Sequence, residues 1–168
     1  DNGGLGVLMA AQYTAGGAPP SCTCMAACPQ GRLALGNGNT IYISSWVSPA
    51  ASTQPYPQWP AIPATESDGW QFSFAAVDEY VVSLYHRDGL YVGTTRAIWF
   101  LSDLSAPLGS GGVPDITLVL SKGIIGRNAH AYTEGAYFVV CDDGVYSVAA
   151  RQEWSELTAP VWKKFIEW

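Results

Sequence analysis

The chain has 168 residues, a net charge of −6, and 48% hydrophobic against only 13% charged residues. This composition is opposite to that of disordered chains, and the length suffices for one domain with a hydrophobic core. The eight Lys and Arg residues are scattered, so the chain lacks the basic surface that nucleic-acid binding requires. No apolar run approaches the roughly 20 residues of a membrane-spanning helix, so we expect no membrane insertion.

The small share of charged residues also indicates whether the chain contacts other proteins. A surface with so few charged residues is typical of one that rests against other protein. A neutral free surface rich in Ser, Thr and Gly is the alternative.

Strand signals dominate from the first residues. Gly6–Thr14 is the first predicted strand, and a break rich in Gly and Pro follows it. Arg32–Leu35 and Thr40–Ser44 are two short strands on either side of residues 36–39 (GNGN), where Gly and Asn tolerate the positive φ of a tight turn. Residues Val47–Ala64 contain five prolines and no strand pattern, which predicts a long surface loop.

The region after this loop is the most regular part of the chain. Asp88-Gly89 and Asp143-Gly144 each lie between apolar runs, which is a strong hairpin signal and makes these residues structural turns. The strands predicted here, in chain order, are Gln71–Phe74, Tyr80–His86, Leu90–Val92, Ala97–Leu101, Ile116–Leu120, Ala129–Thr133, Ala136–Cys141 and Val145–Val148.

Helical periodicity occurs at one place, Ala159–Trp168. Its apolar residues share one face at helical spacing, and Pro160 suits a first helical turn. We expect a short C-terminal helix, with a last strand or an ordered tail as the alternative.

One strand–turn–strand unit is written more than once. Val81–Val92 matches Tyr137–Val148, with Tyr91 over Tyr146, and Arg32–Ser44 is a weaker third copy. Units that recur about every fifty residues with several short strands are the mark of propeller blades, which bury their apolar faces on one another.

The predicted fold is therefore all-β, with repeated antiparallel blades in a β-propeller-like arrangement and a short C-terminal helix. Three blades do not close a ring comfortably. Either the chain is an excerpt, or its sheet edges pair with another chain so that an oligomer completes the ring, or a further blade escapes detection. The expected organisation is an N-terminal strand and Cys-containing linker (1–30), a blade-repeat domain (31–158) and a helix or tail (159–168).

The four cysteines have no clear chemical role. Cys22, Cys24 and Cys28 form C-x-C-x3-C, which is not the usual spacing of a zinc site, and Cys141 lies far away. We expect free thiols and no metal or other cofactor. A disulfide or a metal within the first three cysteines stays open.

No catalytic constellation can be assembled, so we predict that the chain is not an enzyme. The two histidines are far apart in sequence, no G-x-S-x-G motif accompanies them, and the acidic pairs sit at ordinary strand ends or turns. Asp68, Asp142 and Asp143 could hold calcium, but the sequence lacks the Asp-x-Asp-x-Asp loop of such sites, so we expect no metal there. A small hydrolase remains the third hypothesis and would need a carboxylate of one pair. The residues considered for a catalytic role are the two histidines and the two acidic pairs: His86, His130, Asp78, Glu79, Asp142 and Asp143.

Aromatic residues offer one possible binding surface. Trp46, Trp59 and Trp70 flank the Pro-rich loop and are the best candidates for exposed rings that stack on sugars. The alternative is that these rings fill the core or contacts between subunits.

The repeated motifs resemble those of a known family. Gly31–Ser44, Leu84–Gly93 (LYHRDGLYVG) and Lys122–Val148 are similar to the propeller blades of phage virion proteins, and Gly6–Ser21 is similar to the segment before their first blade. Those proteins are tail tube-end, nozzle-like and tail-tip structural proteins.

The resemblance implies a non-enzymatic subunit of a bacteriophage tail, made in the bacterial cytoplasm. Its implied partners are other virion tail proteins and copies of itself. A lectin-like module that binds polysaccharide of the host surface is the alternative.

Overall fold

The computed structural model describes residues 19–46, 59, 65–76, 78–108, 114–133, 135–149 and 153–158. The strand expected at Gly6–Thr14 and the helix expected at Ala159–Trp168 lie outside these residues. So does the Val47–Ala64 loop, apart from Trp59. Within the described part, no helix has the length and apolar character needed to cross a membrane.

The described chain is all-β and forms three four-stranded antiparallel sheets, in each of which consecutive strands are neighbours. Sheet A contains β1 (Cys24–Ala27), β2 (Leu33–Asn37), β3 (Thr40–Ile43) and β4 (Trp70–Ser73), with the short 3-10 helix η1 (Pro29–Gly31) between its first two strands. Sheet B contains β5 (Val81–His86), β6 (Leu90–Thr94), β7 (Ile98–Leu101) and β8 (Ile116–Leu120). Sheet C contains β9 (His130–Tyr132), β10 (Ala136–Cys141), β11 (Gly144–Ala149) and β12 (Trp154–Glu156).

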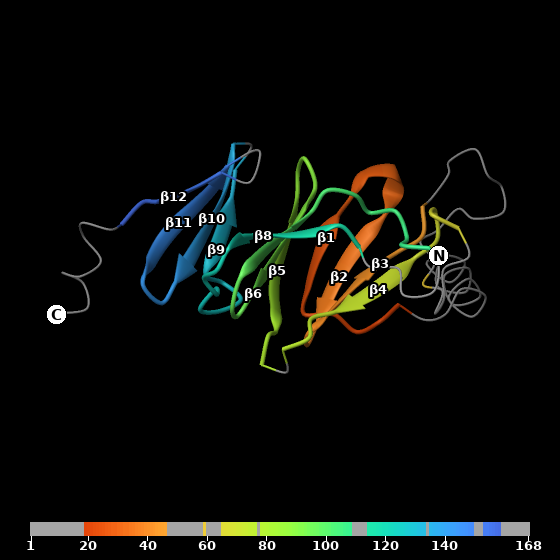
Figure 1. Ribbon diagram of the computed structural model, residues 1–168, viewed down its shortest axis with the longest axis horizontal. Coiled ribbons are helices and arrows are strands. Elements are labelled where there is room, and N and C mark those ends of the chain that lie inside the picture. The colour runs from red at the N-terminus through yellow and green to blue at the C-terminus, as the bar shows by residue number, and fades with distance from the viewer. Residues whose placement is uncertain are drawn as a thin grey trace, which may run out of the picture.

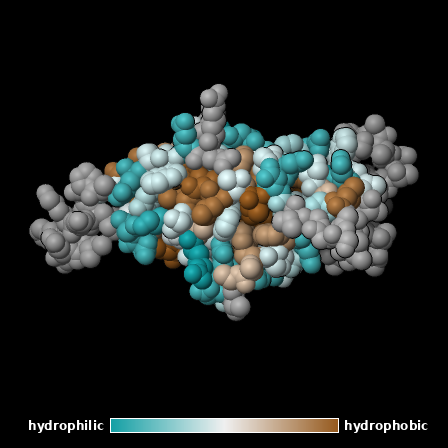
Figure 2. Space-filling model, in the orientation of Figure 1, coloured by the Kyte–Doolittle hydropathy of each residue, from teal (hydrophilic) through white to brown (hydrophobic). Residues whose placement is uncertain are grey.

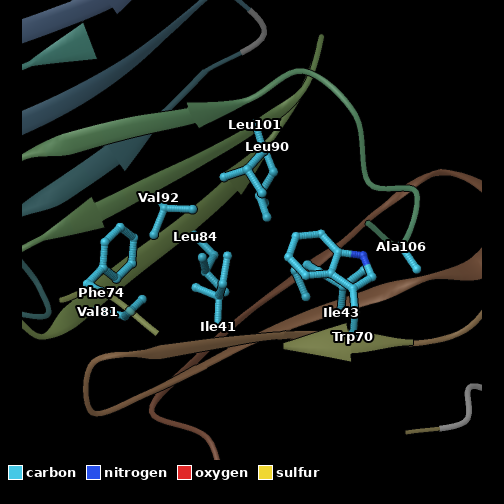
Figure 3. Packing of buried hydrophobic residues seen from close by; sticks show 11 residues of the cluster. Ile41, Ile43, Trp70, Phe74, Val81, Leu84, Leu90, Val92, Leu101 and Ala106 are labelled. Carbon is cyan, nitrogen blue, oxygen red and sulfur yellow. The ribbon is translucent and has the colours of Figure 1, made fainter. Parts of the chain in front are cut away.

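The sheets lie one after another along the long axis of the molecule, with sheet B between sheets A and C (Figure 1). An apolar cluster fills the space between sheets A and B: Ile41 and Ile43 of β3 face Leu84 and Val92 of sheet B (Figure 3). All four side chains are buried. Such interdigitation removes apolar surface from water, which is the main stabilising contribution to the fold.

A second cluster joins sheets B and C. Tyr91 on β6 meets Tyr137 on β10 with ring centroids 6.3 Å apart, and the Tyr137 hydroxyl forms a hydrogen bond with Ser83 on β5. Gly93 lies under this contact, because a Cβ there would come within 2.6 Å of the Tyr137 hydroxyl oxygen. The backbone of β6 therefore approaches sheet C closely.

Sheet B is consequently buried on both faces, whereas sheet C is buried on one. All five residues of β6 are buried, but burial alternates along β10, where Tyr137, Val139 and Cys141 point into the second cluster. Figure 2 shows an apolar patch over the middle of the visible face, with polar residues around it.

The register of the repeat differs from the one expected from the sequence. The turn at Asp143 joins the second and third strands of sheet C, but the Asp88-Gly89 turn joins the first and second strands of sheet B. Tyr91 and Tyr146 are therefore not equivalent. An Asp-Gly pair predicts a turn but carries no information about the position of its hairpin within a sheet.

The equivalent hairpins join the second and third strands of each sheet. They close at the pairs Asn37–Thr40 in sheet A and Cys141–Gly144 in sheet C, and between Thr94 and Ala97 in sheet B. In this register the position of Tyr146 corresponds to Trp99 in sheet B and Tyr42 in sheet A. The repeat is thus present, but the hairpin of sheet C corresponds to β6–β7 of sheet B and not, as predicted, to β5–β6.

Most predicted strands agree with the structure to within about two residues, which is the usual uncertainty of strand ends. Gly36 and Asn37, expected in a turn, extend β2, because Gly38 alone takes the positive φ (57°) and the turn needs only residues 38–39. β1 and β12 were not predicted. β1 lies in the segment expected to be a Cys-containing linker and pairs with β2.

Candidate functional site

Arg32 contributes to the lining of two cavities in the described part of the chain. The residue is only 4% exposed. Its guanidinium donates hydrogen bonds to the Leu104 carbonyl (2.6 Å) and the Glu66 carbonyl (3.0 Å), and burial lowers its pKa. Trp70 also donates its indole N–H to the Leu104 carbonyl, at 2.9 Å. Arg32 thereby holds two loops, which are distant in sequence, against sheet A.

A cavity of about 510 Å³ opens on one side of Arg32. Trp46 is 42% exposed at this cavity, and its backbone N–H donates to the Ser67 carbonyl at 2.8 Å. The remaining lining is polar except for Leu108 and includes the side chains of Gln30 and Glu66. An aromatic ring beside amide, carboxyl and hydroxyl groups can stack on a sugar and hydrogen-bond its hydroxyls.

A second, smaller cavity of about 280 Å³ is also lined by Arg32 and lies beside the β5–β6 turn. His86, Arg87 and Asp103 contribute to its lining. Gln30 lines both cavities and has a left-handed backbone (φ 60°), which non-glycine residues rarely adopt. Gln30 of η1 and Arg32, the first residue after η1, therefore line both cavities.

The three tryptophans named from the sequence have different environments. Trp46 is exposed at the larger cavity, and Trp59 is half-buried. Trp70 is only 4% exposed and belongs to the cluster between sheets A and B, so the expectation that it is an exposed ring is wrong. Its place on the inner face of β4 explains the difference, because that face packs against sheet B.

The first candidate carboxylate pair points in two directions. Glu79 is 6% exposed and accepts hydrogen bonds from the Thr94 hydroxyl (2.8 Å) and the Trp99 indole N–H (2.7 Å). Asp78 is at the surface and forms an ion pair with Arg96 at 2.7 Å. Glu79 therefore serves a buried hydrogen-bond network, and the pair does not flank a common cleft.

The second pair lies at the β10–β11 turn. Asp143 forms an ion pair with Lys122 and accepts a hydrogen bond from the Tyr146 hydroxyl (3.1 Å). The hydrogen bond from Lys122 lowers the pKa of Asp143, and burial raises the pKa of Tyr146 to about 12. Asp142, the neighbouring residue, is exposed. These contacts fasten the turn to the end of β8.

The structure does not bring the two histidines together. His86 ends β5 at the smaller cavity, whereas His130 begins β9 in sheet C, where its ring meets the edge of Tyr137 at 6.2 Å. Burial lowers the pKa of both imidazoles. Asp68 accepts a hydrogen bond from the Thr65 backbone N–H (2.7 Å), in a loop away from the β10–β11 turn.

All four cysteines are free thiols. Cys24 and Cys28 are half-buried against the first apolar cluster, and burial raises the pKa of each to about 11. Burial raises the pKa of Cys141, in the second cluster, to about 12. Among the residues that the structure describes, no group of three His, Cys, Asp or Glu side chains is placed to hold a metal ion.

The sequence interpretation identified Trp46 but not Arg32. The two carbonyls that Arg32 binds belong to residues 34 and 72 positions away, and no local pattern marks them. The usable signal was a single basic residue directly before an apolar strand.

No family model matches the sequence, and a comparison with curated proteins finds no similar chain.

Proposed function

We propose that this chain is a non-enzymatic structural component of a bacteriophage virion, as a subunit of the tail or tail tip. The observation that carries the proposal is the stack: three sheets of the same topology, each a meander of four strands, pack face to face through two apolar clusters. Repeats of this kind bury a continuous core between neighbours and can extend by adding neighbours.

In this proposal the three sheets are blades of a β-propeller-like arrangement that copies of the chain complete. The three sheets share the register of the hairpin between their second and third strands, so equivalent residues face the same direction in each sheet. This shared register supports the propeller-like arrangement. The small share of charged residues fits a subunit that other tail proteins surround. Synthesis in the bacterial cytoplasm and residence in the virion tail complete the proposal.

The test is to purify phage particles from the lysate in which the chain is made and to measure its peptides by mass spectrometry. We expect a stoichiometric amount relative to other tail proteins, and antibody labelling at the tail in electron micrographs. A chain that stays wholly in the particle-free fraction would overturn the proposal.

A second candidate, binding of host-surface polysaccharide, is favoured by one observation. Trp46 exposes its ring at the mouth of the 510 Å³ cavity, among polar side chains that suit sugar hydroxyls. Aromatic platforms of this kind need only be flat and accessible, and they do not need a deep pocket.

A glycan array with purified chain tests this candidate. Trp46→Ala should abolish saturable binding, whereas Trp154→Ala, which removes an indole that is 51% exposed on sheet C, should leave it unchanged. Equal loss in both variants, or no binding by the unaltered chain, would exclude a sugar site at Trp46.

A further inference from the structure

One face of sheet C is mainly apolar and is turned away from the rest of the stack, with one charged residue, Glu153, at its edge opposite Ala149. Neither apolar cluster includes its residues, although five of the eight are Ala, Phe or Val on the two central strands. By strand alternation and pairing, this outer face consists of Ala131, Ala136, Phe138, Val140, Val145, Ser147, Ala149 and Ser155.

A row of aliphatic residues crosses this face. Val140 pairs with Val145, Ile125 donates its backbone N–H to the Val140 carbonyl at 3.1 Å, and Leu157 donates to the Val145 carbonyl at 2.8 Å. Ile125 is 61% exposed and Leu157 is 50% exposed, while the two valines are half-buried. Four neighbouring aliphatic residues with this exposure form an unusual feature for a free sheet surface.

The equivalent rows in the other two sheets are covered. Gly36 and Ile41 in sheet A, and Gly93 and Ile98 in sheet B, correspond to Val140 and Val145. Ile41 belongs to the cluster beneath sheet B, and Ile98 to the cluster beneath sheet C. In each sheet, therefore, this is the face on which the next sheet packs. Sheet C presents it with no following sheet among the described residues.

The equivalent positions in the three sheets also indicate which face would pack against the outer face of sheet C. Sheets B and C each meet the preceding sheet through the face that carries Trp99 or Tyr146. In sheet A that face carries Tyr42 and points away from sheet B. This face of sheet A lacks charged side chains: its residues are Met25, Ala27, Leu33, Leu35, Asn37, Thr40, Tyr42, Gln71 and Ser73.

Exposure on this face of sheet A is uneven. Met25 is 64% exposed, Leu33 and Tyr42 are half-buried, and Leu35 is buried. Val140 also differs from the two covered rows, which have glycine at its position. A sheet docked on sheet C would therefore lie farther away than sheet C lies from sheet B.

We propose that a second copy of this chain docks the outer face of its sheet A on the outer face of sheet C. The contact continues the stack head to tail, so that one copy follows another in a ring or a filament. The inference rests on the proposed function, because it names the surface through which the structural subunit assembles. In the equivalent interface Tyr91 packs on Tyr137, so Phe138 of one copy should meet Leu33 of the next.

Sedimentation velocity over a range of concentrations measures the association. Ser147→Lys places a charge in the middle of the outer face and should weaken association by at least about tenfold, because an unpaired charge is costly to bury. Ser121→Lys makes the same change at an exposed residue after β8 and should leave association unchanged. Val145→Thr, a milder change, should give a smaller loss, and it serves if the Lys variant does not fold.

Photo-crosslinking locates the contact. A benzophenone amino acid in place of Phe138 should join two copies, with the crosslink mapped by mass spectrometry to residues 25–42. The same group in place of Ser121 is the control. A crosslink to sheet C of another copy, or to residues 159–168 of the same chain, would overturn the proposal, as would a monomer at every concentration or association that Ser147→Lys leaves intact.

These outcomes separate the inference from the proposed function. A chain that is stoichiometric in phage particles but does not associate through sheet C disproves only the docking surface. A chain that associates through sheet C but is missing from particles disproves only the virion assignment.

Discussion

Sheets B and C have the same topology, but their environments differ. Every residue of β6 is buried, and both faces of sheet B contact another sheet. Burial alternates strictly along β11, yet the half-buried positions there and on β10 still include valine and phenylalanine. A one-sided sheet ordinarily carries polar residues on its free face. Sheet C therefore carries apolar residues on both faces, as a sheet packed between two others does, although only one of its faces packs against another sheet among the described residues.

The largest expected change in the free energy of unfolding comes from truncating equivalent residues in sheets B and C. Ile98→Ala, which empties a fully buried site in sheet B, should lower the free energy of unfolding by about 4 kcal/mol. Val145→Ala on the outer face of sheet C should cost about 1 kcal/mol or less, because that side chain is only half-buried. Urea denaturation below the concentration of association measures both. Equal losses would mean that the outer face is already covered within one chain.

The next effect concerns carboxylates in the same two regions. Glu79→Ala leaves the buried Thr94 hydroxyl and Trp99 indole N–H without their acceptor, which should cost about 2 kcal/mol. Asp143→Ala removes a pair whose side chains are 40% and 41% exposed, and should cost less than about 1 kcal/mol. Thermal and urea unfolding of both variants check the order. A larger loss for Asp143→Ala would contradict it.

A smaller effect extends the comparison to the other end of the stack, in sheet A. Gly38→Ala should destabilise by about 1 kcal/mol, because Gly38 has a φ of 57° that alanine adopts only with strain. The cost should be purely conformational, since a Cβ there meets no atom within 4 Å. Gly126→Ala has equal space and no positive φ, so it should be neutral.

The last effect appears only at alkaline pH and concerns Cys141, on the inner face of sheet C. Burial raises the pKa of Cys141 from 9.0 to about 12, so the fold favours the neutral thiol. This contribution to stability is complete below pH 9 and is lost as the pH rises from 9 toward 12, because the unfolded chain then releases the proton first. Cys141→Ala should flatten the fall in stability over that range.

Thiol labelling at pH 8 gives an independent check on the same cysteine. Exposed Cys22 should react quickly, and Cys141 should react only after unfolding. Rapid labelling of Cys141 would show that the contact between sheets B and C opens readily.

Sequence alone predicted the interior strands well, for a physical reason. Runs such as Ala136–Cys141 are apolar, β-branched or aromatic, and Gly or Asp bounds them, so local preference and tertiary burial agree. The edge strands β1 (CMAA) and β12 (WSE) carry no such signal. They form because a neighbouring strand offers free backbone groups, and that information is not local.

The candidate site was only half predictable. Trp46 could be named because large aromatic residues beside a Pro-rich loop are conspicuous. The burial of Trp70 depends on which face of β4 meets sheet B, and the position of Arg32 depends on two distant carbonyls. The misplaced register of the repeat has a similar origin, since the order of strands within a sheet follows from pairing across the whole chain.

Because every sheet is built from strands that follow one another in sequence, each can be inserted, deleted or duplicated without rethreading the chain. Loss of the central unit, by contrast, would deprive both flanking units of their shared support at once. A gene that encodes such a row can therefore grow longer by tandem duplication of one segment.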